Sequence, residues 1–167
     1  RSTGHTYAYN GTISGSGGVV IVGGGTIVLG ASNAYTGGTG MQGGVLAVSE
    51  NAALGAPSGT LSFYSTGGGT LRTTASLGVF TRNISTAGSG GGFDTNGFDT
   101  TLAGSITGTG RIRKEGTGTL TLTGANTYSG DTTVNAGTLL VSNLTGSGVG
   151  TGVATVQSVA TLCGSGV

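Results

Sequence analysis

The stretch GTGTLTLTGANTYSGDTTVNAGTLLVS, at Gly116–Ser142, decides the fold. Within it, Leu120 and Leu122 alternate with threonines, which is typical of a strand with leucines on one face and hydroxyl groups on the other. Glycine, asparagine and aspartate surround the short apolar runs and favour turns. The stretch therefore predicts short strands that are joined by tight turns.

A second stretch of the chain repeats this pattern. The segments Gly11–Ser49 and Gly104–Ser142 align without a gap at an offset of about 93 residues, and they agree at roughly 16 of 39 positions. Asn33 then aligns with Asn126, and asparagine suits equivalent turns because it tolerates left-handed backbone conformations. Self-similarity at a fixed offset indicates a repeat architecture, in which each unit buries its apolar face against the next.

The composition agrees with a folded, strand-rich chain. The chain has 167 residues, of which 39 are glycine, and charged residues make up only 7%. Disorder is excluded because the hydrophobic fraction is 35% and Val, Ile and Leu recur in short runs. Collagen is excluded because glycine has no period of three and there is one proline. Helices are disfavoured because each window with helical apolar spacing contains several glycines.

Short strand signals recur along the whole chain. The predicted strands are Val19–Val22, Thr26–Leu29, Val45–Val48, Thr60–Phe63, Thr70–Arg72, Gly78–Arg82, Gly110–Arg113, Thr119–Leu122, Thr138–Val141 and Ala154–Val156. A sandwich or barrel would need hairpins with two-residue turns, whereas the repeat places apolar residues in register for ladders through one core. We therefore predict an all-β fold over residues 1–167, a parallel β-helix of about seven coils with roughly 20–25 residues each. The repeat offset would then equal about four coils.

The charge of the chain excludes phosphate-driven binding of nucleic acid. The net charge is +1, and the only basic cluster, Arg111–Lys114, is followed directly by Glu115. Since Arg111 and Arg113 alternate with Ile112, we expect a solvated strand face there. No run of about 20 apolar residues is present, so no transmembrane segment is predicted. A single cysteine allows no internal disulfide.

The later copy resembles the passenger-associated transport repeat of bacterial autotransporters, the type V secretion systems. That motif runs G-x-G-x-L-x-L-x-G-x-N-x-Y-x-G-x-T-x-v-x-x-G-x-L. The matching residues are Gly116, Gly118, Leu120, Leu122, Gly124, Asn126, Tyr128, Gly130, Thr132, Val134, Gly137 and Leu139. The earlier copy departs from the motif in part, for example where Met41 stands in place of Val134.

The resemblance implies a right-handed parallel β-helix at the outer surface of a Gram-negative cell, or released from it. It also implies export through a C-terminal β-barrel translocator, a partner that this chain lacks. A chain with few charges and no disulfide suits passage through a narrow pore, and its coils can then stack one on another outside. No signal peptide is visible at Arg1, and the pattern still runs near Val167, so we expect a piece of a longer passenger.

Few side chains offer catalytic or metal-binding chemistry. His5 is the only histidine and no G-x-S-x-G motif is present, so a Ser-His-Asp triad is not predicted. Gly91–Asp99 partly resembles the calcium-binding nonapeptide but misses its third glycine and its aspartate position. We expect Asp94, Asn96 and Asp99 to cap backbone amides in a turn instead. Cys163 is expected to be a packed small residue, and no catalytic, cofactor or metal site is predicted.

Three functions are compatible with these features. The first is a surface structural module, non-catalytic, that supports adhesion to a host receptor or matrix protein. The second is the stem of an autotransporter enzyme, a protease or esterase, whose catalytic domain lies elsewhere. The third is a secreted effector or growth-factor-like passenger that binds a host receptor. The passenger-like repeat and the scarcity of catalytic groups favour the first.

If this chain contacts a partner, the first region to consider lies between the two copies, where the sequence departs from repetition. The aromatic residues of this region are Phe63, Tyr64, Phe80, Phe93 and Phe98. If they are exposed, they form a candidate contact patch. The alternative is that they stack in the core or at the corners of the coils.

Overall fold

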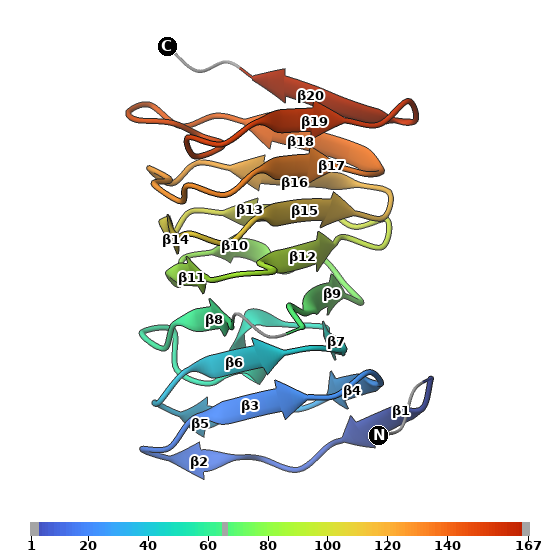
Figure 1. Cartoon of the computed structure of the whole chain (residues 1–167). Coiled ribbons are helices and arrows are strands. Elements are labelled where there is room, and N and C mark those ends of the chain that lie inside the picture. The colour runs from blue at the N-terminus through green and yellow to red at the C-terminus, as the bar shows by residue number, and fades with distance from the viewer. Residues whose placement is uncertain (1–3, 65–66, 165–167) are drawn as a thin grey trace.

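The computed structural model describes residues 4–64 and 67–164. These residues form a rod of stacked coils that rises from the N-terminal to the C-terminal end (Figure 1). Strands of successive coils pair in parallel. The chain crosses the front of the rod from left to right and returns behind it as it rises, so the coil is right-handed, the usual hand of parallel crossovers. The predicted fold class, a parallel β-helix, is confirmed.

One sheet, which we call sheet A, runs the length of the rod and counts its coils. It has eight strands, so seven complete coils lie between its first and last strands. The prediction of about seven coils is therefore confirmed. In order along the rod, its strands are β1 (Thr6–Tyr9), β4 (Thr26–Leu29), β7 (Val45–Val48), β9 (Thr70–Thr73), β12 (Gly91–Asp94), β15 (Ile112–Glu115), β17 (Thr132–Val134) and β19 (Ala154–Val156).

Two further sides complete each coil. Sheet C contains β3 (Val19–Val22), β6 (Thr39–Gln42), β8 (Leu61–Phe63), β11 (Ile84–Thr86) and β14 (Ile106–Gly108). The third side begins with sheet B, which contains β2 (Ser14–Gly15) and β5 (Ala34–Tyr35). It continues with sheet D, which contains β10 (Gly78–Phe80), β13 (Thr100–Leu102), β16 (Thr119–Leu122), β18 (Gly137–Val141) and β20 (Ala160–Gly164). The short 3-10 helix η1 (Asn51–Leu54) lies between β7 and β8 in the chain. Among the described residues, no helix has the length and apolar character needed to cross a membrane.

The predicted strands all overlap strands of the structure, and the differences have local causes. The prediction Gly110–Arg113 begins two residues before β15, and Gly110 lies too close to the preceding coil for a side chain: an added Cβ would be 2.7 Å from the Ala87 nitrogen. Strands such as β6 and β12 were not predicted because glycine interrupts their apolar pattern. Each pairs in parallel with a strand on both sides, and these partners are distant in the sequence, so the local sequence pattern does not predict them.

Apolar side chains stack in ladders through the centre of the rod. On sheet A, Ile27 pairs with Leu46, and Leu46 pairs with Leu71. Leu71 pairs in turn with Phe93. Leu46, Leu71 and Phe93 are buried. Because burying one such side chain contributes about 1.5–3 kcal/mol, contacts between coils are the main source of stability in this fold.

The two repeat copies lie four coils and one side of the rod apart. Four pairing steps lead up sheet A from Thr26 to Val45, Thr70, Gly92 and Arg113. Thr119, the repeat partner of Thr26, lies beyond that point in β16 of sheet D. The two copies are therefore separated by four coils plus one side of the rod, which is one side more than the predicted offset of about four coils. Figure 1 shows β3 and its repeat partner β15 both crossing the front of the rod, so sheet A shifts around the rod between the copies.

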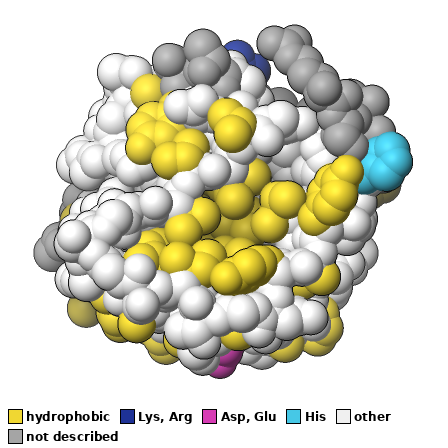
Figure 2. Space-filling view, turned by 90° about the horizontal axis from the view of Figure 1, so that it is seen from below, with side chains coloured by type: hydrophobic (Ala, Val, Ile, Leu, Met, Phe, Trp, Pro, Cys, Tyr) yellow, Lys and Arg dark blue, Asp and Glu magenta, His cyan; other side chains and the backbone are white. Residues whose placement is uncertain are grey.

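The apolar interior is open at both ends of the described rod. Figure 2 shows the N-terminal end, where apolar side chains occupy the middle of the surface. Tyr7 and Tyr9 of β1 pair with Ile27 and Leu29 on the inward side, yet they are 55% and 48% exposed. At the other end, Leu162 is 37% exposed. These side chains continue the ladders, and each pairs with a described coil on one side.

Candidate functional site

The repeat motif builds a hydrogen-bonded corner between coils, and Asn126 is its first part. This side chain is buried, and its Oδ1 accepts a hydrogen bond of 2.9 Å from the backbone N–H of Ile106 in the preceding coil. Its Nδ2 donates at 2.7 Å to the carbonyl oxygen of Gly148 in the following coil. One amide group thus joins three successive coils and satisfies a buried donor and a buried acceptor.

Tyr128 is the second part of this corner. Its ring is buried, and its hydroxyl lies 2.5 Å from Oγ1 of Thr132. That Oγ1 also donates at 3.2 Å to the carbonyl oxygen of Val149. The ring packs on Gly150, where an added Cβ would lie 2.9 Å from two ring atoms. Burial raises the pKa of Tyr128 to about 12, so its hydroxyl stays protonated at neutral pH.

The earlier repeat copy forms the same corner. Oδ1 of Asn33 accepts a hydrogen bond of 2.7 Å from the Ile13 N–H. Its Nδ2 donates at 2.7 Å to the Ala53 carbonyl oxygen. The hydroxyl of Tyr35 lies 2.6 Å from Oγ1 of Thr39. Each of these contacts has its counterpart in the later copy, so the corner is a property of the motif and not of one coil.

The other motif positions lie in the core or where backbones touch. The motif leucines are buried: Leu120, Leu122 and Leu139. An added Cβ would lie 2.5 Å or less from a backbone atom of the preceding coil at Gly118, Gly124, Gly130 and Gly137. Gly116 has a φ of 65°, a conformation that favours glycine. The motif glycines therefore allow successive coils to approach closely.

The five aromatic residues predicted as a candidate contact patch do not share one surface. Phe63, Phe80 and Phe93 are buried, and the Phe63 and Phe93 rings pack edge to face with centroids 5.5 Å apart. These three stack inside the coils, as the alternative predicted, so the exposed patch is wrong for them. Tyr64 follows β8 and is 40% exposed, whereas Phe98 lies between β12 and β13 and is 37% exposed. Of the five, Tyr64 and Phe98 are accessible, at different corners of the rod.

The acidic turn that partly resembles a calcium site is held by its own hydrogen bonds. Oδ1 of Asp94 accepts from the Asn96 N–H at 3.0 Å. Oδ1 of Asp99 accepts from the Thr119 N–H at 2.8 Å. Both aspartates therefore cap backbone amides, as predicted. The prediction is wrong for Asn96, whose Nδ2 donates to the Thr73 carbonyl oxygen at 3.2 Å. Oδ2 of Asp94 is also paired with Nε of Arg72 at 2.7 Å.

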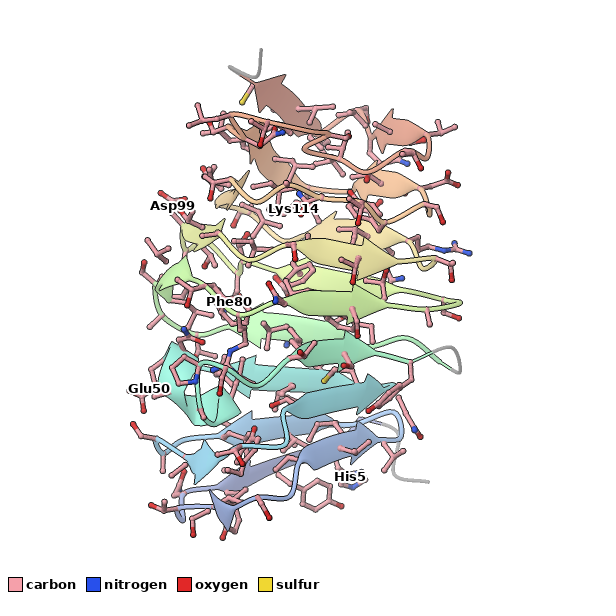
Figure 3. The ribbon with its side chains drawn as sticks, turned by 90° about the vertical axis from the view of Figure 1, so that its left-hand side faces the viewer. His5, Glu50, Phe80, Asp99 and Lys114 are labelled. Atoms are coloured by element: carbon pink, nitrogen blue, oxygen red, sulfur yellow. The ribbon has the colours of Figure 1, made fainter. Side chains whose placement is uncertain are left out.

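Other groups with chemical potential are scattered along the rod. Figure 3 shows His5, Glu50 and Asp99 at separate heights. Within residues 4–64 and 67–164, no three His, Cys, Asp or Glu side chains gather as a metal site. His5 is exposed, and its ring stacks on Tyr7 with centroids 6.3 Å apart. Cys163 is exposed: it pairs with Leu140 on the outward face of sheet D, so the prediction of a packed residue is wrong.

Comparison with known proteins identifies the same two segments that form the corners. The family model of the passenger-associated transport repeat matches residues 22–48 and 112–141. The chain is 36% identical over 151 residues to the "Adhesin BmaC autotransporter" of Brucella suis biovar 1 (strain 1330). The chain is an autotransporter passenger sequence. That alignment covers 80% of the passenger described here but 4% of the relative's length. No solved structure matches this passenger chain.

The passenger contains a buried arginine that the sequence analysis missed. Arg82 follows β10 and is 1% exposed. Its guanidinium donates, at 3.0–3.1 Å, to the carbonyl oxygens of Asn51, Leu54, Gly55, Ala56 and Gly59. Burial lowers the pKa of Arg82. The side chain holds η1 and the following loop against the next coil, and no local sequence pattern predicts so distant a set of partners.

A buried lysine of the passenger was also missed. Lys114 lies in the ladder of sheet A, paired with Phe93 on one side and Val134 on the other, and it is 0% exposed. Its Nζ donates to the carbonyl oxygens of Glu115 and Gly116, each at 2.7 Å, and of Ala136 at 3.1 Å. The solvated face predicted from Arg111 and Arg113 therefore does not extend to Lys114. The available signal was its spacing of two residues from Ile112, which places both on the inward face.

Proposed function

We propose that this passenger is a non-catalytic, adhesin-like rod at the surface of a Gram-negative cell, or released from it. The observation that carries the proposal is the 36% identity to an autotransporter adhesin over 80% of the chain. Because that match spans 4% of the relative, adhesion is proposed for the passenger to which this chain belongs, with these coils as supporting scaffold or as part of the contact surface.

The architecture supports a structural role. Each coil contacts its neighbours, so the rod can form coil by coil as the chain emerges from its translocator. The buried Asn126 and Tyr128 corner links successive coils and stiffens them. We infer that the partner during export is the C-terminal β-barrel of the same protein. A host receptor or matrix protein is the proposed partner afterwards.

The chemistry of the described residues also favours a non-catalytic role. The single histidine is exposed beside Tyr7, and both aspartates of the acidic turn are engaged in capping. Neither an enzyme stem nor a receptor-binding effector has an observation of its own in its favour. A non-catalytic surface rod therefore accounts for these features without an additional catalytic domain or receptor-binding site.

The test is saturable binding of the purified chain to host cells and to immobilised matrix proteins. A β-helix fragment of equal length from an unrelated protein serves as the control, because it presents the same fold with a different surface. We expect saturable binding above the control. Binding equal to the control on every cell type and matrix protein would contradict a contact role for these coils and leave them as scaffold.

A further inference from the structure

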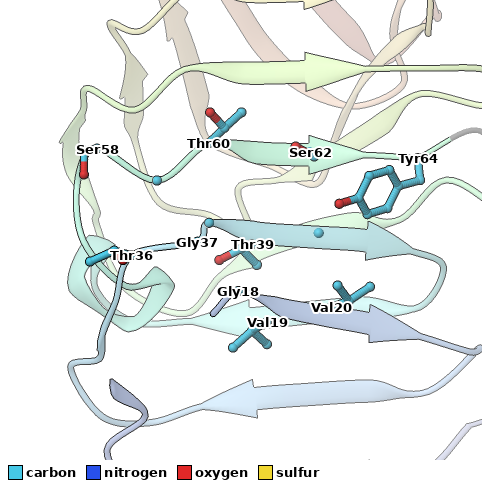
Figure 4. A pocket seen from close by; sticks show the side chains of 13 residues that line it. Gly18, Val19, Val20, Thr36, Gly37, Thr39, Ser58, Thr60, Ser62 and Tyr64 are labelled. Carbon is cyan, nitrogen blue, oxygen red and sulfur yellow. The ribbon is translucent and has the colours of Figure 1, made fainter. Parts of the chain in front are cut away.

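A groove crosses three coils on the outer side of sheet C. It has a volume of about 250 Å³ (Figure 4). Its floor is backbone, because glycines 37, 38, 40 and 59 present no side chains there. Residues on and around that floor include Val20, Thr36, Gly40, Ser58, Thr60 and Tyr64.

The ring of Tyr64 lies against the backbone of Gly40. An added Cβ at Gly40 would be 2.5 Å from Cε2 of Tyr64, so any larger residue there would displace the ring. Gly40 pairs with Val20 in the preceding coil, which is 49% exposed and extends the apolar edge of the groove. One side of the Tyr64 ring thus rests on β6, and with 40% of the residue exposed its other side is open to solvent.

Hydroxyl groups line the end of the groove away from this ring (Figure 4). Thr36, Ser58 and Thr60 are exposed and line the groove from two successive coils (Figure 4). Within the described part of the chain, their side-chain hydroxyls make no hydrogen bond. Each can therefore both donate to and accept from a ligand. The residues that line the groove include no charged side chain, so neither an anion nor a cation has a counter-charge there.

We propose that the groove binds a neutral glycan, with one sugar ring stacked on Tyr64 and sugar hydroxyls bonded to Thr36, Ser58 and Thr60. A sugar carries C–H groups on its ring face and hydroxyls around its edge. The C–H groups of one sugar are attracted to the negative face of the tyrosine ring, and the hydroxyls of further sugars along the groove meet the free hydroxyls at its other end. The inference rests on the proposed adhesin-like function and names the class of ligand.

The test uses the whole chain and immobilised neutral oligosaccharides of glucose, galactose and N-acetylglucosamine, with heparin as the anionic comparison. Tyr64→Ala removes the stacking ring, and Thr60→Val removes one hydroxyl while keeping the side-chain shape. Phe98→Ala is the matched control, because Phe98 is exposed to a similar degree at another corner. Circular dichroism and thermal melting verify that each variant is folded.

We expect saturable binding to at least one neutral oligosaccharide, weakened about tenfold by Tyr64→Ala and unchanged by Phe98→Ala. Thr60→Val should weaken binding by a smaller factor. Binding to none of the neutral oligosaccharides, binding to heparin alone, or an equal loss in Phe98→Ala would overturn the inference. Binding to cells without binding to these sugars would retain the adhesin-like function and refute the glycan groove. The reverse result would retain the groove and refute the function.

Discussion

Tyr35 and Tyr128 make the same hydroxyl hydrogen bond from two different sides of the rod. The Tyr35 hydroxyl lies 2.6 Å from Oγ1 of Thr39. The Tyr128 hydroxyl lies 2.5 Å from Oγ1 of Thr132. Tyr35 belongs to β5 of sheet B, whereas the residue after Tyr128, Ser129, bonds through its backbone to β14 of sheet C. The motif therefore specifies a local corner, and the length of the intervening coils determines which side of the rod receives it.

The first prediction concerns this hydroxyl bond. Tyr35→Phe and Tyr128→Phe each remove a buried hydrogen bond while keeping the ring that packs on the next coil. We expect each to lower the free energy of unfolding by about 1 kcal/mol, measured by urea denaturation followed by circular dichroism. Because the two corners are equivalent, the two losses should be similar. Tyr64→Phe serves as the control, since that hydroxyl is at the exposed groove, and it should change stability little.

A loss at one corner with none at the other would refute the equivalence of the two corners. A full loss for Tyr64→Phe would show that the measurement reports a general effect of removing tyrosine hydroxyls.

The second prediction concerns the contact between Gly150 and the Tyr128 corner. Gly150 has a φ of 69°, and an added Cβ would meet the Tyr128 carbonyl oxygen. Gly78 has a φ of 63° with nothing within 4 Å of an added Cβ. Gly78→Ala should therefore cost only the backbone strain, about 1–2 kcal/mol. Gly150→Ala should cost about 1–3 kcal/mol more, because the coils must also move apart. Equal losses in urea denaturation would show that crowding between coils contributes nothing.

The fold was predictable because its determinants are periodic. Leu120 and Leu122 alternate with threonines, and the same pattern returns in the other copy, so the sequence alone indicated stacked short strands. The side of the rod occupied by each copy was not predictable, since coil lengths differ: Thr26 pairs with Val45, but Val45 pairs with Thr70. These uneven lengths decide which residues become neighbours.

The candidate site was less predictable for the same reason. The groove depends on the contact between Tyr64 and Gly40 of the preceding coil, and no spacing in the sequence predicts that contact. Of the five aromatic residues, the sequence could not separate buried Phe63 from exposed Tyr64 without the strand bounds. The spacing of two residues between Lys114 and Ile112 places both on the same face of a strand, but a charged side chain is rarely buried, so the pattern alone does not predict a buried lysine.

The third prediction concerns Arg82. Arg82→Met leaves several buried carbonyl oxygens around η1 without their donor, and we expect it to lower the free energy of unfolding by about 3–5 kcal/mol. Arg82→Lys should recover only part of this loss, because one ammonium cannot reach both ends of the loop. Arg72→Met is the control: Arg72 pairs with Asp94 at a partly exposed site, and its loss should stay within about 1 kcal/mol.

Urea denaturation measures these losses, and limited proteolysis reports on the loop. We expect Arg82→Met to speed cleavage within residues 51–59, whose carbonyl groups Arg82 holds. If Arg82→Met and Arg72→Met lose the same stability, Arg82 does not hold the loop in the way the hydrogen bonds indicate.

The last prediction concerns the pH dependence that Lys114 introduces. Burial lowers the pKa of Lys114 from 10.5 to about 8, while Asp94 and Glu115 oppose the shift. Below pH 8 the lysine is charged in both states, and the folded state bears the full cost of the buried charge. Between pH 8 and 10 the unfolded chain keeps a proton that the folded chain has lost, so stability rises with pH, by at most about 3 kcal/mol.

Above pH 10 the buried tyrosines reverse this trend. Burial raises the pKa of Tyr35, and that of Tyr128 to about 12, so the unfolded chain loses these protons first and stability falls as pH rises further. The free energy of unfolding should therefore peak near pH 10. Lys114→Met should abolish the rise between pH 8 and 10 and keep the fall above it. Urea denaturation at each pH measures both limbs, with Arg113→Met as a control that should retain the rise. A rise that persists in Lys114→Met would assign it to another group.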